Sequence, residues 1–249
     1  MTSGNLQRVA SQAWELFSMF RSGRIDGSRF AQNLNLLRDN VSKISAADLN
    51  IDTKNLPNYA PWAAPSGYMD ICEDSFMTMG VFTLRKTGMN IPLHDHPGMH
   101  GILKVVYGQV RIRSYSYAER IGQPGQTPPA VPQFAGLASQ PSAESLTPTR
   151  LASDSVHNSE SGAILLTPEI GNIHAIEAVD GPAAFLDVLS PPYDPPERDC
   201  QYYHELPVNG DAAANQKDQI TWLLRIPQPK EFHCELEDYP GPDIQIGST

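Results

Sequence analysis

The sequence predicts a mainly β protein with helices near its N-terminus. The 249 residues include 18 Gly and 22 Pro, and a combined share above the globular average indicates many turns. From about Met77, short apolar runs alternate with Gly, Pro and Asn, a pattern typical of strands in a sandwich or barrel. Before Leu49 the apolar residues instead recur at helical spacing. We therefore expect one domain over residues 1–249, with a helical segment over 1–48.

Two amphipathic helices are expected in the N-terminal segment. Their apolar residues form two runs of helical periodicity, separated by Gly23 and the pair Asp26-Gly27. Amphipathic helices of this length usually cover a core, so we expect the two to pack antiparallel on the strands. Binding of a partner through their apolar faces is the alternative. The apolar positions are Val9, Ala13, Leu16 and Phe20, then Phe30, Leu34, Leu37, Val41 and Ile44.

A β-hairpin is expected over residues 102–117, and an exposed loop after it. Val110 and Ile112 alternate with basic residues, and Gly108-Gln109 suits a type II′ turn between two paired strands. Residues 121–160 are rich in Pro, Ser, Gly and Gln and offer little apolar surface to offset the entropy of ordering. We expect an insertion loop there. Apolar strands resume at residues 163–168, 174–179, 183–190 and 220–226.

Charge and composition exclude several classes of partner. Lys plus Arg total 18 against 28 Asp plus Glu, a formal net charge of −10, so nucleic acid is not expected to bind. No apolar run approaches the roughly 18 residues of a membrane span, and the N-terminus lacks the features of a signal peptide. Three widely spaced cysteines predict no disulfide framework. We expect a monomeric, cytoplasmic protein in which Cys72 and Cys234 are structural thiols.

His94 and His96 form the most informative spacing in the chain. Residues i and i+2 of an extended strand project from the same face, so both imidazoles can reach one metal ion. A bare His-x-His pair is also common among surface or hydrogen-bonded histidines. Spacing alone further leaves a catalytic zinc site with three His ligands open. The surrounding motifs therefore decide how the pair is interpreted.

Two segments resemble the sequence motifs of the cupin superfamily. Residues 88–96 (Gly-x5-His-x-His) resemble the first motif, and residues 162–174 (Gly-x5-Pro-x2-Gly-x2-His) resemble the second with one residue inserted. The resemblance implies a cupin double-stranded β-helix, or jelly-roll, barrel in which His174 supplies a third imidazole from an adjacent strand. Cupins often place a Glu ligand where this chain has Met99-His100-Gly101. A carboxylate ligand is therefore not expected, and His100 is expected in the pocket.

Longer strings give a finer resemblance. IPLHDHPGMHGILKVVYG, DGPAAFLDVLSPPYDP, RDCQYY and YPGP resemble the 2-aminoethanethiol (cysteamine) dioxygenase family, which is related to the plant cysteine oxidases. The resemblance runs in order from about residue 49 to residue 242. It implies one mononuclear iron(II) held by His94, His96 and His174, and addition of both atoms of O₂ to a thiol sulfur to give a sulfinic acid. The implied substrates are cysteamine, converted to hypotaurine, and peptides or proteins with an N-terminal cysteine, the latter in oxygen sensing.

The chemistry of three neutral imidazoles agrees with that implication. Such ligands leave the ion its double charge, so a substrate thiol that binds the metal loses its proton there and is held as the thiolate. Six-coordinate iron with three protein ligands also keeps positions open for sulfur and O₂. Two alternatives stay open, a zinc enzyme and a non-enzymatic cupin that only binds a ligand.

Four further residues are candidate catalytic residues. Asp187 lies in an apolar strand, where a carboxylate is costly unless it has a partner. The resemblance implies that it orients a ligand histidine or a substrate ammonium, and an ion pair at a sheet edge is the alternative. For Tyr193 the resemblance implies a hydrogen bond to substrate or bound oxygen, against simple packing on a Pro-rich turn. Cys200 and Tyr202 face the same side of an extended chain, and the resemblance implies a thioether crosslink, against simple packing.

Overall fold

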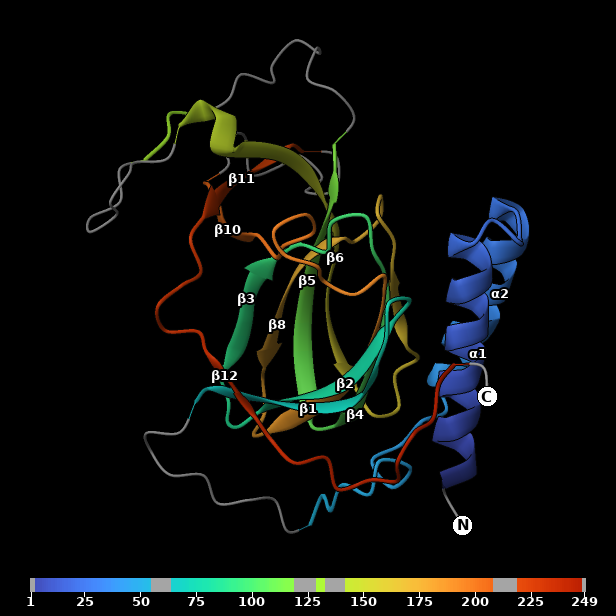
Figure 1. The fold of residues 1–249 in the computed structure, drawn as a ribbon. Helices are drawn as coiled ribbons and strands as arrows, with labels where there is room; N and C mark the ends of the chain where they lie inside the picture. Colours follow the sequence, from blue (N-terminus) through green and yellow to red (C-terminus); the bar gives the residue numbers. More distant parts are fainter. Residues whose placement is uncertain (1–2, 55–63, 119–128, 133–141, 208–218, 248–249) are drawn as a thin grey trace.

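Two helices and two sets of strands make up the protein, in a computed structural model that describes residues 3–54, 64–118, 129–132, 142–207 and 219–247. The helices come first (Figure 1). The elements are α1 (Ser3–Arg21), α2 (Gly27–Val41), β1 (Ser66–Glu73), β2 (Thr78–Leu84), β3 (Asn90–His94), β4 (His100–Tyr107), β5 (Gln109–Tyr117), the 3₁₀ helix η1 (Ala143–Ser145), β6 (Leu146–Asn158), β7 (Ile164–Leu166), β8 (Ile173–Ala178), β9 (Ala183–Ser190), β10 (Tyr202–Glu205), β11 (Thr221–Ile226) and β12 (Cys234–Leu236).

The strands form a six-stranded sheet and a closed barrel. The sheet has the order β12-β1-β2-β9-β4-β7, and the barrel has the order β10-β11-β6-β5-β8-β3. Pairing of Tyr202 in β10 with His94 in β3 closes the barrel. A buried apolar cluster joins the two sets of strands, with members such as Leu103, Phe185 and Ile176. The predicted fold class, a mainly β cupin-type barrel with N-terminal helices, is confirmed.

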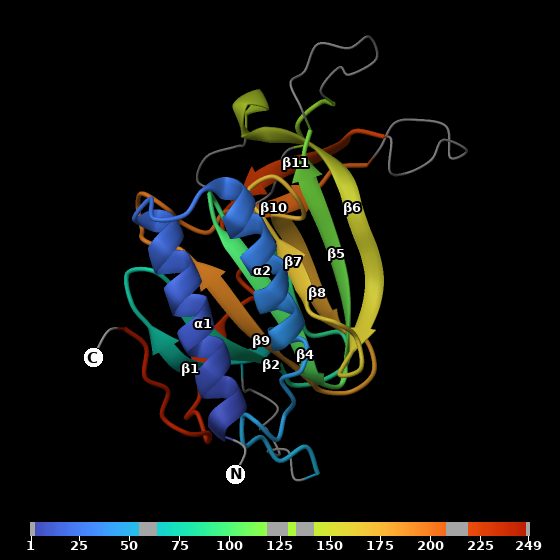
Figure 2. The same ribbon diagram turned by 90° about the vertical axis from the view of Figure 1, so that its right-hand side faces the viewer.

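The two helices cover the outer face of the six-stranded sheet (Figures 1 and 2). Asp26 starts α2, because its carboxylate accepts a hydrogen bond from the backbone N–H of Arg29 at 2.9 Å, a cap that contributes about 1 kcal/mol to stability. Along β9, Leu186 and Val188 pack with the helices, whereas Phe185 faces the interior. Because side chains alternate along a strand, Asp187 also faces inward. No helix in the described part of the chain has the length and apolarity of a membrane span.

The expected hairpin over residues 102–117 is wrong, although both of its strands exist. β4 pairs with β7 and β9, whereas β5 pairs with β6 and β8. Gly108 is therefore a corner at which the chain passes from the sheet to the barrel. Its φ of +70° and the 2.3 Å that would separate an added Cβ from the Pro182 carbonyl oxygen both require glycine. Val110 and Ile112 are buried, as the alternation predicts.

The expected loop over residues 121–160 is wrong for its second part, where β6 forms. β6 pairs with β5 from Gln109↔Asn158 to Tyr117↔Thr149, and with β11. Its side chains are mostly polar and partly exposed, so the strand is held by backbone pairing rather than by burial, and composition gives little signal for it. Most of the first part of the expected loop lies outside the described residues.

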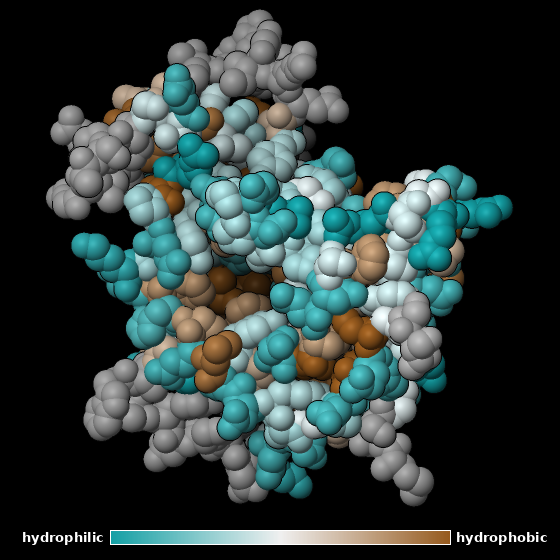
Figure 3. Space-filling view, in the orientation of Figure 1, coloured by the Kyte–Doolittle hydropathy of each residue, from teal (hydrophilic) through white to brown (hydrophobic). Residues whose placement is uncertain are grey.

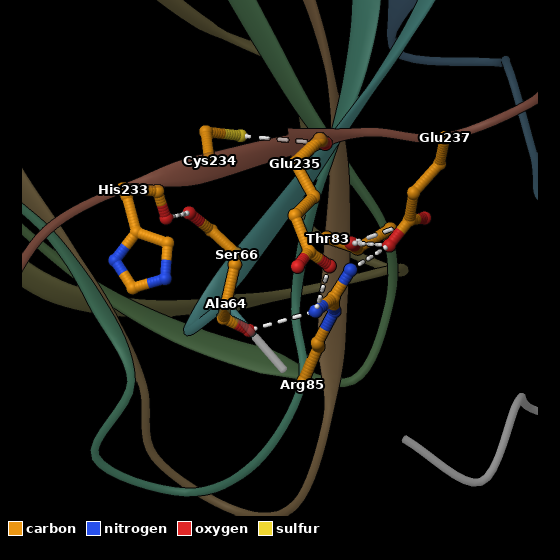
Figure 4. Close-up of polar contacts among 8 residues, drawn as sticks. All are labelled: Ala64, Ser66, Thr83, Arg85, His233, Cys234, Glu235 and Glu237. Carbon is orange, nitrogen blue, oxygen red and sulfur yellow. Dashed lines mark hydrogen bonds and ion pairs between the residues drawn. The ribbon is translucent and has the colours of Figure 1, made fainter. Parts of the chain in front are cut away.

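The short edge strand β12 is held to the sheet by a buried arginine. β12 runs parallel to β1, with Tyr68 opposite Leu236. Arg85, whose side chain is only 6 % exposed, donates to Glu235 at 2.7 Å and to Glu237 at 2.8 Å. Both glutamates reach from the β12 segment toward this one guanidinium (Figure 4). Two ion pairs on a largely buried cation therefore fix the chain segment that follows β11.

Candidate metal centre

The structure brings together the three histidines that the sequence singles out. His94 ends β3 and lies directly opposite His174 of β8 in the strand register. His96 follows β3 in the connecting segment rather than in the strand itself. All three side chains are buried, and one ring nitrogen from each lies within 4.8 Å of the others. Within the described part of the chain this cluster contains no carboxylate, in agreement with the missing Glu of the first motif.

Hydrogen bonds on the outer ring nitrogens leave the inner ones free to bind a metal. His94 Nδ1 lies 2.8 Å from the Pro92 carbonyl oxygen and can only donate to it. The Tyr193 hydroxyl donates to the Asp95 carbonyl oxygen at 2.7 Å, and His96 Nδ1 lies 2.8 Å from the same hydroxyl. We therefore assign His96 Nδ1 as the donor to Tyr193. In both rings Nε2 then carries a lone pair.

The spacing of two of the inner nitrogens fits a shared metal ion. Nε2 of His96 and Nε2 of His174 are 3.1 Å apart. Metal bonds of about 2.1 Å place two ligand nitrogens roughly 3–3.4 Å apart at right-angled or tetrahedral geometry. Burial lowers the pKa of His94 to about 4. Burial, and then neighbouring histidines, hold the pKa values of His96 and His174 well below 6.5. Neutral imidazoles at pH 7 are what a metal ligand set needs.

Two polar residues that the sequence analysis missed hold the segment around His96. Asn172 is fully buried, accepts from the His96 N–H at 3.2 Å and donates to the His96 carbonyl oxygen at 2.8 Å. The Asp95 carboxylate accepts from the Gln201 N–H at 2.9 Å and from the Tyr203 hydroxyl at 2.8 Å. Asp95 lies inside the first histidine motif and Asn172 inside the second, and this position could have identified them in the sequence. They fix the backbone that aims the imidazole.

Tyr193, Cys200 and Tyr202 lie together beside the histidines. The Tyr193 hydroxyl is hydrogen-bonded to His96 Nδ1 and to the Asp95 carbonyl oxygen, so in this structure it orients the His96 ring. The Cys200 thiol is within hydrogen-bonding range of the hydroxyls of Tyr193 and Tyr202. Burial raises the pKa of the Cys200 thiol to about 11. Sulfur and the Tyr202 phenol are thus neighbours, as the i, i+2 spacing predicts.

A cavity of about 300 Å³ has Asp187 and Tyr193 in its wall. One oxygen of Asp187, Oδ1, has no hydrogen-bond partner among the described residues although the residue is only 7 % exposed. Burial raises its pKa to about 7, against the opposing effect of the Val188 N–H. β9 lies between β2 and β4, so Asp187 is not at a sheet edge. Tyr193 lines the same cavity and connects it to His96.

The rest of the cavity wall comes from strands far apart in the sequence. Tyr68 of β1 and Gly80 of β2 lie side by side, since a Cβ added at Gly80 would be 2.3 Å from the Tyr68 hydroxyl oxygen. Cys234 and Leu236 of β12 complete the wall. Cys234, which was expected to be a structural thiol only, therefore lines the cavity. The face that carries β12 is hollowed near its middle, with apolar residues at the bottom (Figure 3). His100, expected in the pocket, packs instead against Phe20 and Phe30.

Comparison with known proteins adds a family to this geometry. The model of the PCO_ADO family matches residues 40–244, which include the three histidines and the cavity residues from Tyr68 to Leu236. This chain belongs to the PCO_ADO family.

Curated relatives agree with the PCO_ADO assignment. The chain is 40 % identical to 2-aminoethanethiol dioxygenase of Homo sapiens and 43 % identical to that of Mus musculus, in each case over 96 % of both chains. It is 26 % identical to plant cysteine oxidase 1 of Arabidopsis thaliana, over 96 % of this chain and 80 % of the relative. The resemblance found in the sequence is confirmed. The PCO_ADO match also leaves the N-terminal helices largely outside the family region.

Proposed function

We propose that the protein is a thiol dioxygenase that adds both atoms of O₂ to a thiol sulfur. The reaction, RSH + O₂ → RSO₂H, turns cysteamine into hypotaurine and the N-terminal cysteine of a peptide into its sulfinic acid. The observation that carries the proposal is the three-histidine cluster. Near it is a cavity whose wall includes Asp187, and the buried Oδ1 of this residue has no hydrogen-bond partner among the described residues. The printed names of the curated relatives, 2-aminoethanethiol dioxygenase and plant cysteine oxidase, describe the same class of reaction.

The donor set supports one iron(II) ion held by His94, His96 and His174. Bound iron(II) would supply the place where the thiolate is held and the redox chemistry with O₂. The protein's own contribution is to keep the imidazoles neutral by burial and to fix their orientation through Pro92 and Tyr193. The absence of a carboxylate from the described cluster leaves the full cationic charge available to a thiolate.

Asp187 supports a substrate with a primary amine near the thiol. Asp187 lines the cavity and its Oδ1 has no partner among the described residues, and an ammonium group is the partner that stabilises a buried carboxylate best. The described residues that line the cavity include no Lys, Arg or His, so a substrate carboxylate would find no counter-ion among them. This favours cysteamine and N-terminal-Cys peptides over free cysteine. Oxidation of protein N-termini would make the enzyme a reporter of oxygen, which we propose on the resemblance alone.

We further propose that Cys200 and Tyr202 form a thioether crosslink during turnover. The bond joins Sγ to a ring carbon of the tyrosine, and two hydrogens are lost with O₂ as the oxidant. The contact of the thiol with the Tyr202 hydroxyl supports it. Intact mass after incubation with iron(II) and O₂ should fall by about 2 Da, and the Cys200→Ser variant should show no such loss. An unchanged mass of the wild type contradicts the crosslink.

The location and assembly of the protein are also proposals. We propose a cytoplasmic monomer that binds neither nucleic acid nor membranes, and the formal net charge of −10 argues against binding to a phosphate backbone. Size-exclusion chromatography with light scattering tests the monomer, for which the chain mass of 27.3 kDa is expected. A mass near twice that value would contradict it.

One experiment separates the proposed function from its alternatives. Metal-free protein is loaded anaerobically with iron(II) or with zinc, then exposed to O₂ with cysteamine or with a peptide that starts with cysteine. We expect O₂ uptake and a product heavier by two oxygen atoms only with iron. Activity with zinc but without iron would favour a zinc enzyme. Ligand binding without O₂ uptake under any condition would favour a non-enzymatic cupin.

A further inference from the structure

We propose that Glu73 is a specificity-determining residue at the mouth of the cavity, which favours peptides carrying Lys or Arg directly after the N-terminal cysteine. The inference rests on the proposed function, because it takes the substrate thiol to be held at the three histidines. It adds a charge preference for the second substrate residue, which cysteamine lacks.

Two acidic residues line the cavity. They are Glu73, the last residue of β1, and Asp187 of β9, and the lining formed by the described part of the chain includes no Lys, Arg or His. Glu73 is exposed. Among the described residues, its side chain has no hydrogen-bond or ion-pair partner, and only its backbone is paired, with Thr78. Both carboxylates act on Tyr68, since each raises the pKa of that phenol after the larger effect of burial.

Two arginines that contact chain segments next to the cavity residues are already engaged. Arg85 is bound by Glu235 and Glu237 (Figure 4), and the combined negative charge of the two glutamates exceeds its positive charge. Arg21 of α1 lies over the ring of Phe76, 5.8 Å from its centroid, and donates to a backbone carbonyl group. Neither cation belongs to the cavity lining. The charge that a substrate meets at the mouth is therefore negative.

The two carboxylates lie at different depths, which separates their roles. Asp187 is buried and has a partnerless oxygen, so it suits the α-ammonium group of the N-terminal cysteine. Glu73 is exposed at the rim. If a cavity of about 300 Å³ is compact, its width roughly equals the length of two extended residues, at about 3.3–3.6 Å each. The side chain of the second substrate residue therefore reaches the rim.

The rim also suits the two parts of a long basic side chain. Leu236 of β12 lines the cavity and is 84 % exposed, so it offers apolar surface to an aliphatic stem. Lys and Arg can lay that stem on apolar surface while the charged end stays in water. The head group can then approach Glu73. An acidic second residue instead meets a carboxylate of like charge and is disfavoured.

The test compares peptides that differ only at the second residue. Peptides beginning Cys-Lys, Cys-Gln and Cys-Glu share the remaining sequence, and kcat/KM is measured for each with iron-loaded protein. Exposed ion pairs change affinity by about two- to five-fold, so the Cys-Lys to Cys-Glu ratio should be about ten-fold in the wild type. It should fall to about two-fold in Glu73→Gln and invert in Glu73→Lys. Raising the salt concentration should shrink the wild-type ratio.

The control variant is Glu15→Gln. Glu15 is exposed on α1 and changes the net charge equally, so its ratio should equal that of the wild type. Because each ratio compares two substrates in one preparation, the active fraction cancels. Kd values from anaerobic calorimetry with iron(II) provide the same ratios without turnover.

An unchanged ratio in Glu73→Gln overturns the proposal, as does an equal fall in Glu15→Gln. Failure of the proposed function is distinct from either result. It would show as absence of O₂-dependent product from cysteamine in the wild type, and the anaerobic Kd ratios would still decide the role of Glu73.

Discussion

The site has two sides that are built in opposite ways. On the metal side, the outer ring nitrogens of His94 and His96 have protein partners, and the inner nitrogens converge. On the proposed substrate side, Asp187 keeps a buried oxygen that has no partner among the described residues, and the wall is assembled mainly from β1, β2, β9 and β12. The contrast indicates that hydrogen bonds fix the metal side, whereas the cavity side retains an unsatisfied polar group.

Removing a ligand from the metal side should have the largest effect. We expect His174→Ala to lose bound iron and to lower kcat/KM for cysteamine by about 10³-fold or more, beyond the roughly 10–100-fold cost of losing an outer-shell partner. Metal content by mass spectrometry and O₂ uptake measure both effects. His157→Ala is the control, because His157 lies on β6 and contacts Ser155. If His174→Ala retained iron at full stoichiometry, His174 would not be a metal ligand and the contrast between the two sides would be wrong.

On the substrate side, the cost of Asp187 should appear as pH-dependent stability. Its pKa of about 7 lies above the ordinary 3.8, so between these values the folded state holds a proton that the unfolded state has lost. The free energy of unfolding therefore falls as pH rises through this window. In urea unfolding of metal-free protein, the stability gain from Asp187→Asn should grow by about 2–3 kcal/mol between pH 5 and pH 8.

Asp154→Asn is the matched control for that prediction. Asp154 is paired with Arg111 and Arg113, and hydrogen bonding to Arg111 lowers its pKa. The substitution should therefore cost stability at both pH values. A gain from Asp187→Asn that does not change with pH would mean that the buried carboxylate carries no charge penalty.

The same Asp187→Asn variant should lose activity while keeping its metal. An ammonium–carboxylate hydrogen bond contributes about 1.5–3 kcal/mol, so kcat/KM for cysteamine should fall by about 10–100-fold. Iron content should stay at the wild-type level, which separates the two sides of the site. Steady-state O₂ uptake together with metal analysis checks this. Equal loss of iron and activity would assign Asp187 to the metal side instead.

Tyr193 contacts both sides and should show the smallest effect. Tyr193→Phe removes the hydroxyl that contacts His96 Nδ1 and the Asp95 carbonyl oxygen but keeps the ring in the cavity wall. We expect about a ten-fold weaker affinity for iron, measured by competition with a chelator. The KM for cysteamine should change little. A large rise in KM with unchanged iron affinity would place the hydroxyl on substrate, as the sequence resemblance implies.

The three histidines of the metal side could be predicted because each lies in a recognisable motif. His94 and His96 are two residues apart, so their spacing alone suggests a shared ion. His174 lies 78 residues beyond His96 and was found through the resemblance to the second cupin motif, whereas Asn172, two residues before it, was missed. The hydrogen bonds of Tyr193 depend on how a distant loop folds over β3, and no spacing reports that contact.

On the substrate side, Asp187 and Tyr193 were predicted, but the rest of the wall could not be, because long-range pairing creates it. Cys234 and Leu236 reach the cavity only through parallel pairing of β12 with β1, which no local pattern signals. Gly108 shows a related ambiguity, since its positive φ suits a hairpin turn and a corner between sheets equally. Local chemistry identified the turn, and only the tertiary arrangement distinguishes its two outcomes.

The two ion pairs of Arg85 influence the order in which the protein is assembled during synthesis. Its guanidinium binds Glu237, a residue 152 positions later in the chain. During synthesis on the ribosome, the edge of β1 emerges long before the strand that covers it, and an uncovered edge can pair with other chains. The wall that meets the substrate is therefore completed late in translation. A nascent chain can assemble its histidine cluster first and only afterwards enclose the space beside it.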